Sequence, residues 1–185
     1  MSALERFSPA TREWFEGAFA APTAAQEGAW AAIAERRHAL VVAPTGSGKT
    51  LSAFLWAIDQ LVQRPPAADD EQRGTRGLYI SPIKALAGDV ERNLRAPLVG
   101  VTTQAVALGA DPPAVTVGVR SGDTTPPERR RLQSCPRDNL TTTTDSLYHF
   151  RTSWAHEALA PVVNPPLSAV PFSFCGPPDP PPARV

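Results

Sequence analysis

Apolar residues along most of the chain alternate between short runs and stretches with a helical period. The short runs predict buried parallel strands at 38–43, 78–80, 115–119 and 139–143. Between them, apolar residues recur at helical spacing over 49–63 and 83–94 and predict amphipathic helices. Strands that alternate with helices indicate an α/β fold with a doubly wound parallel sheet.

Two further helices are predicted ahead of the first strand. Ser8 and Pro9 are typical of a helix N-cap followed by proline in the first turn. Thr23 and Gln26 have the spacing of a capping box, in which each side chain accepts a hydrogen bond from the backbone of the other residue. From that start, the second helix carries Trp30 towards the core.

The alternating pattern ends near residue 160. Nine of the 21 prolines in the chain fall within 161–185, and proline lacks the amide donor that a sheet requires. We therefore expect an ordered domain over 1–160, followed by an irregular, proline-rich tail over 161–185.

The composition indicates a globular protein without a dominant charge. Of 185 residues, 42% are hydrophobic, and 18 basic residues balance 18 acidic ones, so nucleic-acid binding would require a local surface. In a short helix predicted at 128–132, Arg129–Arg131 are interpreted as a solvated face, with a phosphate contact as the alternative. No apolar run approaches the ~20 residues of a membrane span, and the two cysteines lack metal-site spacing. We expect a soluble, cytoplasmic protein with no membrane partner.

The strongest chemical signal joins the first strand to the helix that follows it. Residues 43–50, Ala-Pro-Thr-Gly-Ser-Gly-Lys-Thr, form a phosphate-loop pattern, although the general pattern starts with glycine rather than alanine. Glycines let backbone N–H groups surround a phosphate at a helix N-terminus. Lys49 would then reach the β- and γ-phosphates, and the Thr50 hydroxyl would bind Mg²⁺. The predicted phosphate-binding residues are Thr45, Gly46, Ser47, Gly48, Lys49 and Thr50.

Other segments resemble helicase motifs. The 43–50 loop resembles that of superfamily 2 helicases, the DEAD/DEAH-box group, and 19–26 resembles the Q motif that precedes it. In those helicases the glutamine reads the adenine edge, so the resemblance implies that Gln26 contacts ATP; a role as helix cap only is the alternative. A glutamine amide both donates and accepts, as adenine requires. Residues 7–159 resemble the N-terminal portion of the large helicase-related proteins of bacteria, ATP-dependent DNA helicases with two RecA-like domains.

The resemblance also implies a nucleic-acid surface. Residues 81–87 resemble motif Ia, 120–124 the next strand-end loop, and 142–147 motif Ib, with Thr144 in place of proline and Asp145 in place of glutamate. Strand-end loops of this kind grip the backbone of DNA, with RNA as the alternative. The implied contacts are Ser81, Pro82, Lys84, Arg120, Gly122, Asp123, Thr142 and Thr143.

The resemblance ends before the catalytic carboxylates of the family. There, a strand after motif Ib ends in D-E-x-H, whose aspartate holds Mg²⁺ and whose glutamate positions the attacking water. Counted without gaps, these positions fall at 165–171, where neither carboxylate is present. We therefore expect a partial RecA-like P-loop domain, with an unpaired edge on the phosphate-loop strand and exposed apolar surface.

The functional expectation is a fragment of a DNA helicase that binds ATP, Mg²⁺ and nucleic acid without hydrolysing ATP or unwinding duplexes on its own. No residue is assigned a catalytic role, and no metal is expected beyond the Mg²⁺ of Mg-ATP. The alternative is a degenerate or frameshifted, non-enzymatic remnant with weak DNA binding or an interaction role. A small P-loop kinase is disfavoured, because the Q motif and motif Ia have no role there.

Overall fold

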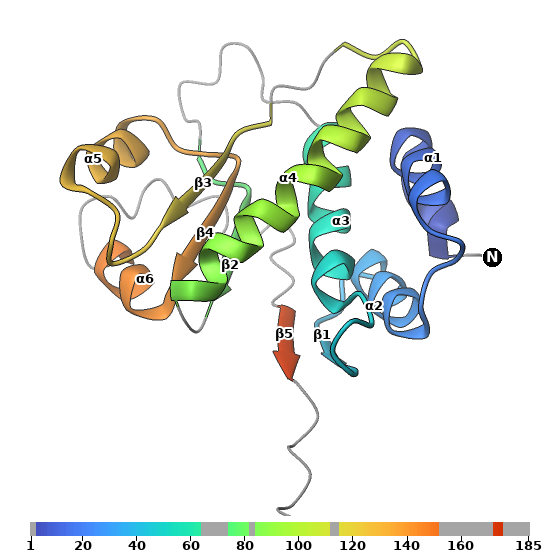
Figure 1. Cartoon of the computed structure of the whole chain (residues 1–185), viewed down its shortest axis with the longest axis horizontal. Helices are drawn as coiled ribbons and strands as arrows, with labels where there is room; N and C mark the ends of the chain where they lie inside the picture. The colour runs from blue at the N-terminus through green and yellow to red at the C-terminus, as the bar shows by residue number, and fades with distance from the viewer. Residues whose placement is uncertain (1–2, 64–73, 82–83, 112–114, 152–171, 176–185) are drawn as a thin grey trace, which may run out of the picture.

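Parallel strands form the centre of the structure (Figure 1). This computed structural model describes residues 3–63, 74–81, 84–111, 115–151 and 172–175, without the side chains of 84–92, 150–151 and 172–175. β2 (Gly77–Ser81), β4 (Asn139–Thr143) and β3 (Val117–Arg120) form a parallel sheet in that order. β1 (Ala39–Val42) pairs in parallel with β5 (Phe172–Cys175). The predicted α/β class is confirmed.

Helices surround these strands. They are η1 (a 3₁₀ helix, Ala3–Arg6), α1 (Pro9–Ala18), α2 (Ala24–Ala34), α3 (Lys49–Gln63), α4 (Lys84–Ala107), α5 (Pro126–Ser134) and α6 (Thr144–Arg151). α1 and α2 begin where their caps predict: Ser8 Oγ accepts from Thr11 N at 3.3 Å, and the Thr23–Gln26 capping box forms in both directions. Within the described residues, no helix combines the length and hydropathy needed to cross a bilayer.

α4 is longer than predicted. The apolar spacing predicts a helix over 83–94, whereas α4 continues to Ala107 with Pro97 in its interior. Proline removes one intrahelical hydrogen bond, and burial of Val101 and Ala105 in the core offsets that loss. Tertiary packing therefore overrides the local stop signal.

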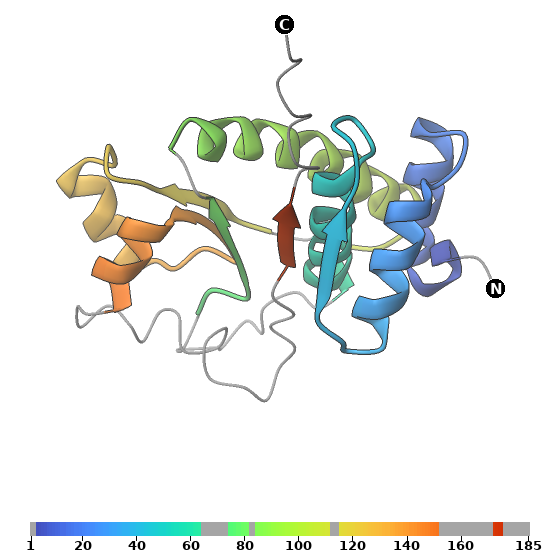
Figure 2. The same ribbon diagram turned by 90° about the horizontal axis from the view of Figure 1, so that it is seen from below.

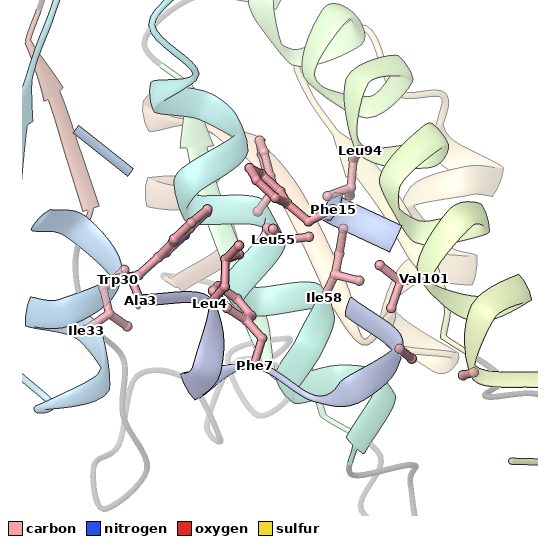
Figure 3. Close-up of a cluster of buried hydrophobic side chains, with 13 residues drawn as sticks. Ala3, Leu4, Phe7, Phe15, Trp30, Ile33, Leu55, Ile58, Leu94 and Val101 are labelled. Carbon is pink, nitrogen blue, oxygen red and sulfur yellow. The ribbon is translucent and has the colours of Figure 1, made fainter. Parts of the chain in front are cut away.

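An aromatic cluster joins the N-terminal helices to α3 (Figure 3). Trp30 is completely buried, and its ring lies edge-on to Phe7 and Phe15 at centroid separations of 4.9 and 5.6 Å. Leu55 and Ile58 of α3 belong to the same cluster. Because edge-to-face pairs contribute ~0.5–1.5 kcal/mol each beyond burial, the cluster fixes α1 and α2 to the helix that follows the phosphate loop.

A buried carboxylate fastens the start of α1 to α3. Asp59 is completely buried, and one of its oxygens accepts from the backbone N and the hydroxyl of Ser8 at 3.1 and 2.6 Å. Gln63 Nε2 donates to the other oxygen at 2.5 Å. The dipole of α1 also favours a negative charge at its N-terminus.

Arg76, Asp138 and Thr116 join the amino ends of β2, β4 and β3. Arg76 Nη2 lies 2.8 Å from one carboxylate oxygen of Asp138. The other oxygen accepts from the N and the hydroxyl of Thr116, both at 2.8 Å. This network fixes the strands relative to one another, and so positions the loops at their opposite, carboxyl ends.

β5 corrects the expectation of an irregular tail at residues 172–175. It pairs with β1 in parallel register from Ala39–Phe172 to Val42–Cys175, so the edge of the phosphate-loop strand that was expected to be open carries a neighbour (Figure 2). The rest of the 161–185 tail lies outside the described residues. On β1, Leu40 and Val42 are 69% and 56% exposed, which agrees with the expectation of exposed apolar surface.

Substitution of Gly100 tests the packing of α1 on α4. A Cβ at Gly100 would overlap the indole of Trp14, whereas a Cβ at Gly28 in α2 would meet nothing within 4 Å. We expect Gly100→Ala to lower the free energy of unfolding by ~1–3 kcal/mol and Gly28→Ala to raise it by ~0.5–1 kcal/mol. Urea denaturation followed by circular dichroism measures both, and equal effects would contradict this packing.

Candidate nucleotide and nucleic-acid sites

The loop between β1 and α3 has the backbone geometry of a phosphate-binding loop. Gly46 and Gly48 adopt positive φ angles of 84° and 77°, a region that side-chain-bearing residues rarely enter. Ser47 N donates to Pro44 O at 3.3 Å and closes the turn. The Ser47 hydroxyl is buried and has no hydrogen-bond partner among the described residues, so a ligand at the loop would satisfy it.

Hydrogen-bond donors converge at the start of α3. The intrahelical bond from Ser52 N to Gly48 O measures 3.0 Å, and the amides of Lys49 and Thr50 precede it, so they have no acceptor within the helix. Lys49 Nζ donates to two carbonyl oxygens of the loop itself, at 2.5 and 2.7 Å. This concentration of donors at a helix N-terminus suits an anion.

The predicted Q-motif residues lie directly on the phosphate loop. Thr23 Oγ1 donates to Ser47 O at 2.9 Å, and Gln26 Nε2 donates to Gly48 O at 3.4 Å. Gln26 Oε1 accepts from Thr23 N at 2.9 Å. A Cβ at Gly48 would overlap the Gln26 amide, so the second glycine of the loop is required by this contact as well as by its φ angle.

The loop residues fit Mg-ATP. The unpartnered Ser47 hydroxyl, the amides at the start of α3 and the Lys49 ammonium supply donors for phosphate oxygens. Thr50 is half-buried at the second residue of α3, and Thr45 is exposed at the tip of the loop. Across the part of the chain that the structure describes, no cluster of three or more His, Cys, Asp or Glu is placed to hold a metal ion.

Four of the predicted nucleic-acid residues lie at the carboxyl edge of the β2-β4-β3 sheet. Ser81 pairs in register with Thr143, and Arg120 pairs with Thr142. Because the strands are parallel, the loops after them leave the same edge. The arrows of β1, β5 and β2 point the same way in Figure 2, so the phosphate loop also follows a carboxyl end on this side of the molecule.

A cleft of about 300 Å³ opens at this edge. Its lining residues are Arg120, Ser121, Gly122, Arg129, Thr143, Asp145, Ser146 and His149. Arg120 is only 7% exposed, and its Nη1 donates to Ser146 O at 3.5 Å. Burial lowers the pKa of Arg120, and the positive charge of Arg129 lowers it further. The cleft therefore brings two positive charges close together, an arrangement that suits an anion.

The other predicted nucleic-acid residues differ in burial and in the contacts that they make. Thr142 and Thr143 are 1% and 4% exposed, and the Thr143 hydroxyl accepts from Ser146 N at 3.4 Å as an N-cap of α6 does. Asp123 is exposed in the loop after β3. Lys84 is the first residue of α4, but its side chain, like all of Pro82, lies outside the described residues.

The favoured interpretation of Arg129–Arg131 as a solvated face does not describe Arg129, for which the alternative of a phosphate contact stays open. A solvated helix face describes Arg130 and Arg131, which are exposed, whereas Arg129 is half-buried and lines the cleft. The sequence feature that could have located Arg129 is the capping box formed by Thr125 and Glu128. It fixes the start of α5, and Arg129 follows Glu128 directly. The hydrogen bonds from Thr125 lower the pKa of Glu128.

A comparison with protein families defines the class. The family described as DEAD/DEAH box helicase matches residues 23–163, more than half of the chain. The chain belongs to the DEAD/DEAH box helicase family, as its α/β fold and phosphate loop indicate.

Within that family, the chain is similar to Lhr helicases. It is 58% identical over 159 residues to the Lhr helicase/probable uracil glycosylase of Mycolicibacterium smegmatis, covering 86% of this chain and 10% of that protein. It is 49% identical over 156 residues to the Lhr helicase/uracil glycosylase of Escherichia coli, covering 83% and 10%. The chain thus spans about a tenth of the length of these relatives.

Solved structures agree with this assignment. The Mycobacterium smegmatis helicase Lhr, bound to ssDNA and AMP-PNP, superposes with a TM-score of 0.80 at 56% identity, covering 87% of this chain and 20% of that one. The yeast DEAD-box splicing factor Prp28 shares the fold, with a TM-score of 0.64 at 22% identity, covering 79% and 33%. The chain is a partial RecA-like domain that resembles the N-terminal helicase domain of Lhr proteins.

Proposed function

We propose that the chain forms the ATP-binding and nucleic-acid-binding part of an ATP-dependent DNA helicase. The observation that carries this proposal is the contact of α2 with the phosphate loop, in which Thr23 and Gln26 donate to the carbonyls of Ser47 and Gly48. The similarity to a helicase Lhr structure that is bound to ssDNA and AMP-PNP supports both ligands.

Gln26 keeps the hydrogen-bonding capacity that adenine requires. Its oxygen already accepts from Thr23, and its nitrogen already donates to Gly48. A carboxamide oxygen accepts two hydrogen bonds and its nitrogen donates two, so one acceptor and one donor position remain. Adenine offers an amino donor beside a ring-nitrogen acceptor, while guanine offers two acceptors there. The capping role and an adenine contact are therefore compatible.

Lys49 and the first turn of α3 would hold the phosphates. When the Lys49 ammonium exchanges its two loop carbonyls for phosphate oxygens, its hydrogen bonds become stronger, because the acceptors are then negatively charged. The amides of Lys49 and Thr50 add neutral donors at a helix N-terminus. The Thr50 hydroxyl would hold Mg²⁺, whose charge offsets that of the phosphates.

A nucleic-acid strand would lie along the carboxyl edge of the β2-β4-β3 sheet. Ser81 ends β2 and Gly122 follows β3 at this edge, where Arg120 supplies positive charge, and Lys84 begins the helix that follows β2. Backbone amides and arginine recognise phosphates rather than bases, so these groups suit a DNA backbone, with RNA as the alternative ligand. Thr142 and Thr143, both buried, would shape the edge from within.

Removal of the Lys49 ammonium tests the nucleotide site. We expect Lys49→Ala to weaken Mg-ATP binding by about a hundredfold, because two charge-assisted hydrogen bonds contribute ~3 kcal/mol. Isothermal titration calorimetry measures the change, and Arg130→Ala, which removes an exposed positive charge, is the matched control. Equal affinities of Lys49→Ala and the wild type would refute the phosphate-loop assignment.

The 185-residue chain should bind ATP without hydrolysing it. Its sequence has no D-E-x-H motif, and positioning plus electrostatic stabilisation supply most of the rate in phosphoryl transfer. We expect no phosphate release above background, with or without single-stranded DNA. Stimulated turnover that disappears in Lys49→Ala would show that catalytic carboxylates lie elsewhere in the chain.

A further inference from the structure

The guanidinium of Arg129 holds the loop that follows β3. Arg129 Nε donates to Thr124 O at 2.8 Å, and its Nη2 donates to Gly122 O at 2.7 Å. A single guanidinium on α5 thus binds two carbonyls of a four-residue loop, Ser121–Thr124. The fork of donors in arginine permits this, and a lysine ammonium has no such fork.

The loop satisfies its other amides internally. Ser121 N donates to Thr124 Oγ1 at 2.8 Å, Thr124 N to Ser121 O at 3.2 Å, and Asp123 N to Ser121 Oγ at 3.3 Å. Thr125 N donates to Glu128 in the capping box of α5. Of the amides of residues 121–125, that of Gly122 alone has no acceptor among the described residues. Gly122 also lines the cleft.

The charges around the cleft favour an anion at this amide. Arg120 and Arg129 both line it, and repulsion between them contributes to the lowered pKa of Arg120. Asp145 and His149 of α6 are the other titratable groups in the lining. A phosphodiester bound between the two arginines would relieve their repulsion.

We propose that Arg129 is a positioning residue for nucleic-acid binding: it holds the Ser121–Thr124 loop in the conformation that offers the Gly122 amide to a backbone phosphate. This inference rests on the proposed nucleic-acid binding. The proposed positioning role applies to Arg129 and not to its neighbours Arg130 and Arg131, which are exposed on the same helix. Holding carbonyls in place requires the arginine fork, so charge alone is insufficient.

Arg129→Lys tests this role because it keeps the charge and loses the fork. We expect the variant to bind labelled oligo-dT about fivefold to tenfold more weakly in fluorescence anisotropy, as loss of one charge-assisted hydrogen bond implies. The slope of log Kd against log salt should stay that of the wild type, since the number of cations is unchanged. Arg130→Lys, the matched control, should bind within twofold of the wild type.

Amide hydrogen exchange in the same variants tests, without any DNA, whether Arg129 holds the Ser121–Thr124 loop. Exchange of the hydrogen-bonded amides of Asp123 and Thr124 should be faster in Arg129→Lys and unchanged in Arg130→Lys, while Mg-ATP binding and the thermal midpoint show that both variants are folded. Wild-type affinity in Arg129→Lys, a reduced salt slope in that variant, or equal losses in both variants would overturn the positioning role. If the wild-type chain fails to bind oligo-dT, the proposed nucleic-acid function fails. Unchanged exchange at Asp123 and Thr124 in Arg129→Lys would separately refute the holding of the loop.

Discussion

The packing of α2 along the phosphate loop and the first turn of α3 is the constraint on which the nucleotide site depends. Three side chains of one capped helix, Thr23, Gln26 and Trp30, donate to the carbonyls of Ser47, Gly48 and Ser52. The indole N–H of Trp30 is completely buried, so loss of its acceptor would cost about 1–3 kcal/mol. The proposed contacts with the base and with the phosphates would consequently come from a single unit of the fold.

The carboxyl edge of the β2-β4-β3 sheet, where a nucleic acid is proposed to bind, is also fixed by polar contacts, and these lie at both ends of the strands. Asp138 joins the amino ends of β2, β3 and β4, and the register places Ser81, Arg120 and Thr143 at their carboxyl ends. Arg129 then fixes the loop after β3 against α5. Buried polar contacts away from the surface thus position the few groups that a phosphate would touch.

The sequence predicts the parts of the structure that local chemistry determines. Residues 43–50 and the Thr23–Gln26 capping box are identifiable because their backbone conformations need glycine, or a hydroxyl and an amide at fixed spacing. α4 beyond residue 94 is not predictable in this way, since packing of Val101 on the core offsets the interior proline. β5 and the role of Arg129 depend on partners distant in sequence or on a loop conformation that composition does not specify.

The selectivity of the nucleotide site for adenine tests most directly whether the Q-motif residues and the phosphate loop act together. Isothermal titration of Mg-ATP and Mg-GTP should show a preference of about tenfold or more for ATP in the wild type, as a bidentate glutamine–adenine pair implies. Gln26→Ala should bring the ratio close to one and leave most of the phosphate affinity intact. Gln26→Glu keeps the capping-box acceptor but loses the donor to Gly48 O, so it should also bring the ratio close to one, with weaker binding of both nucleotides. An unchanged ratio in both variants would contradict the account.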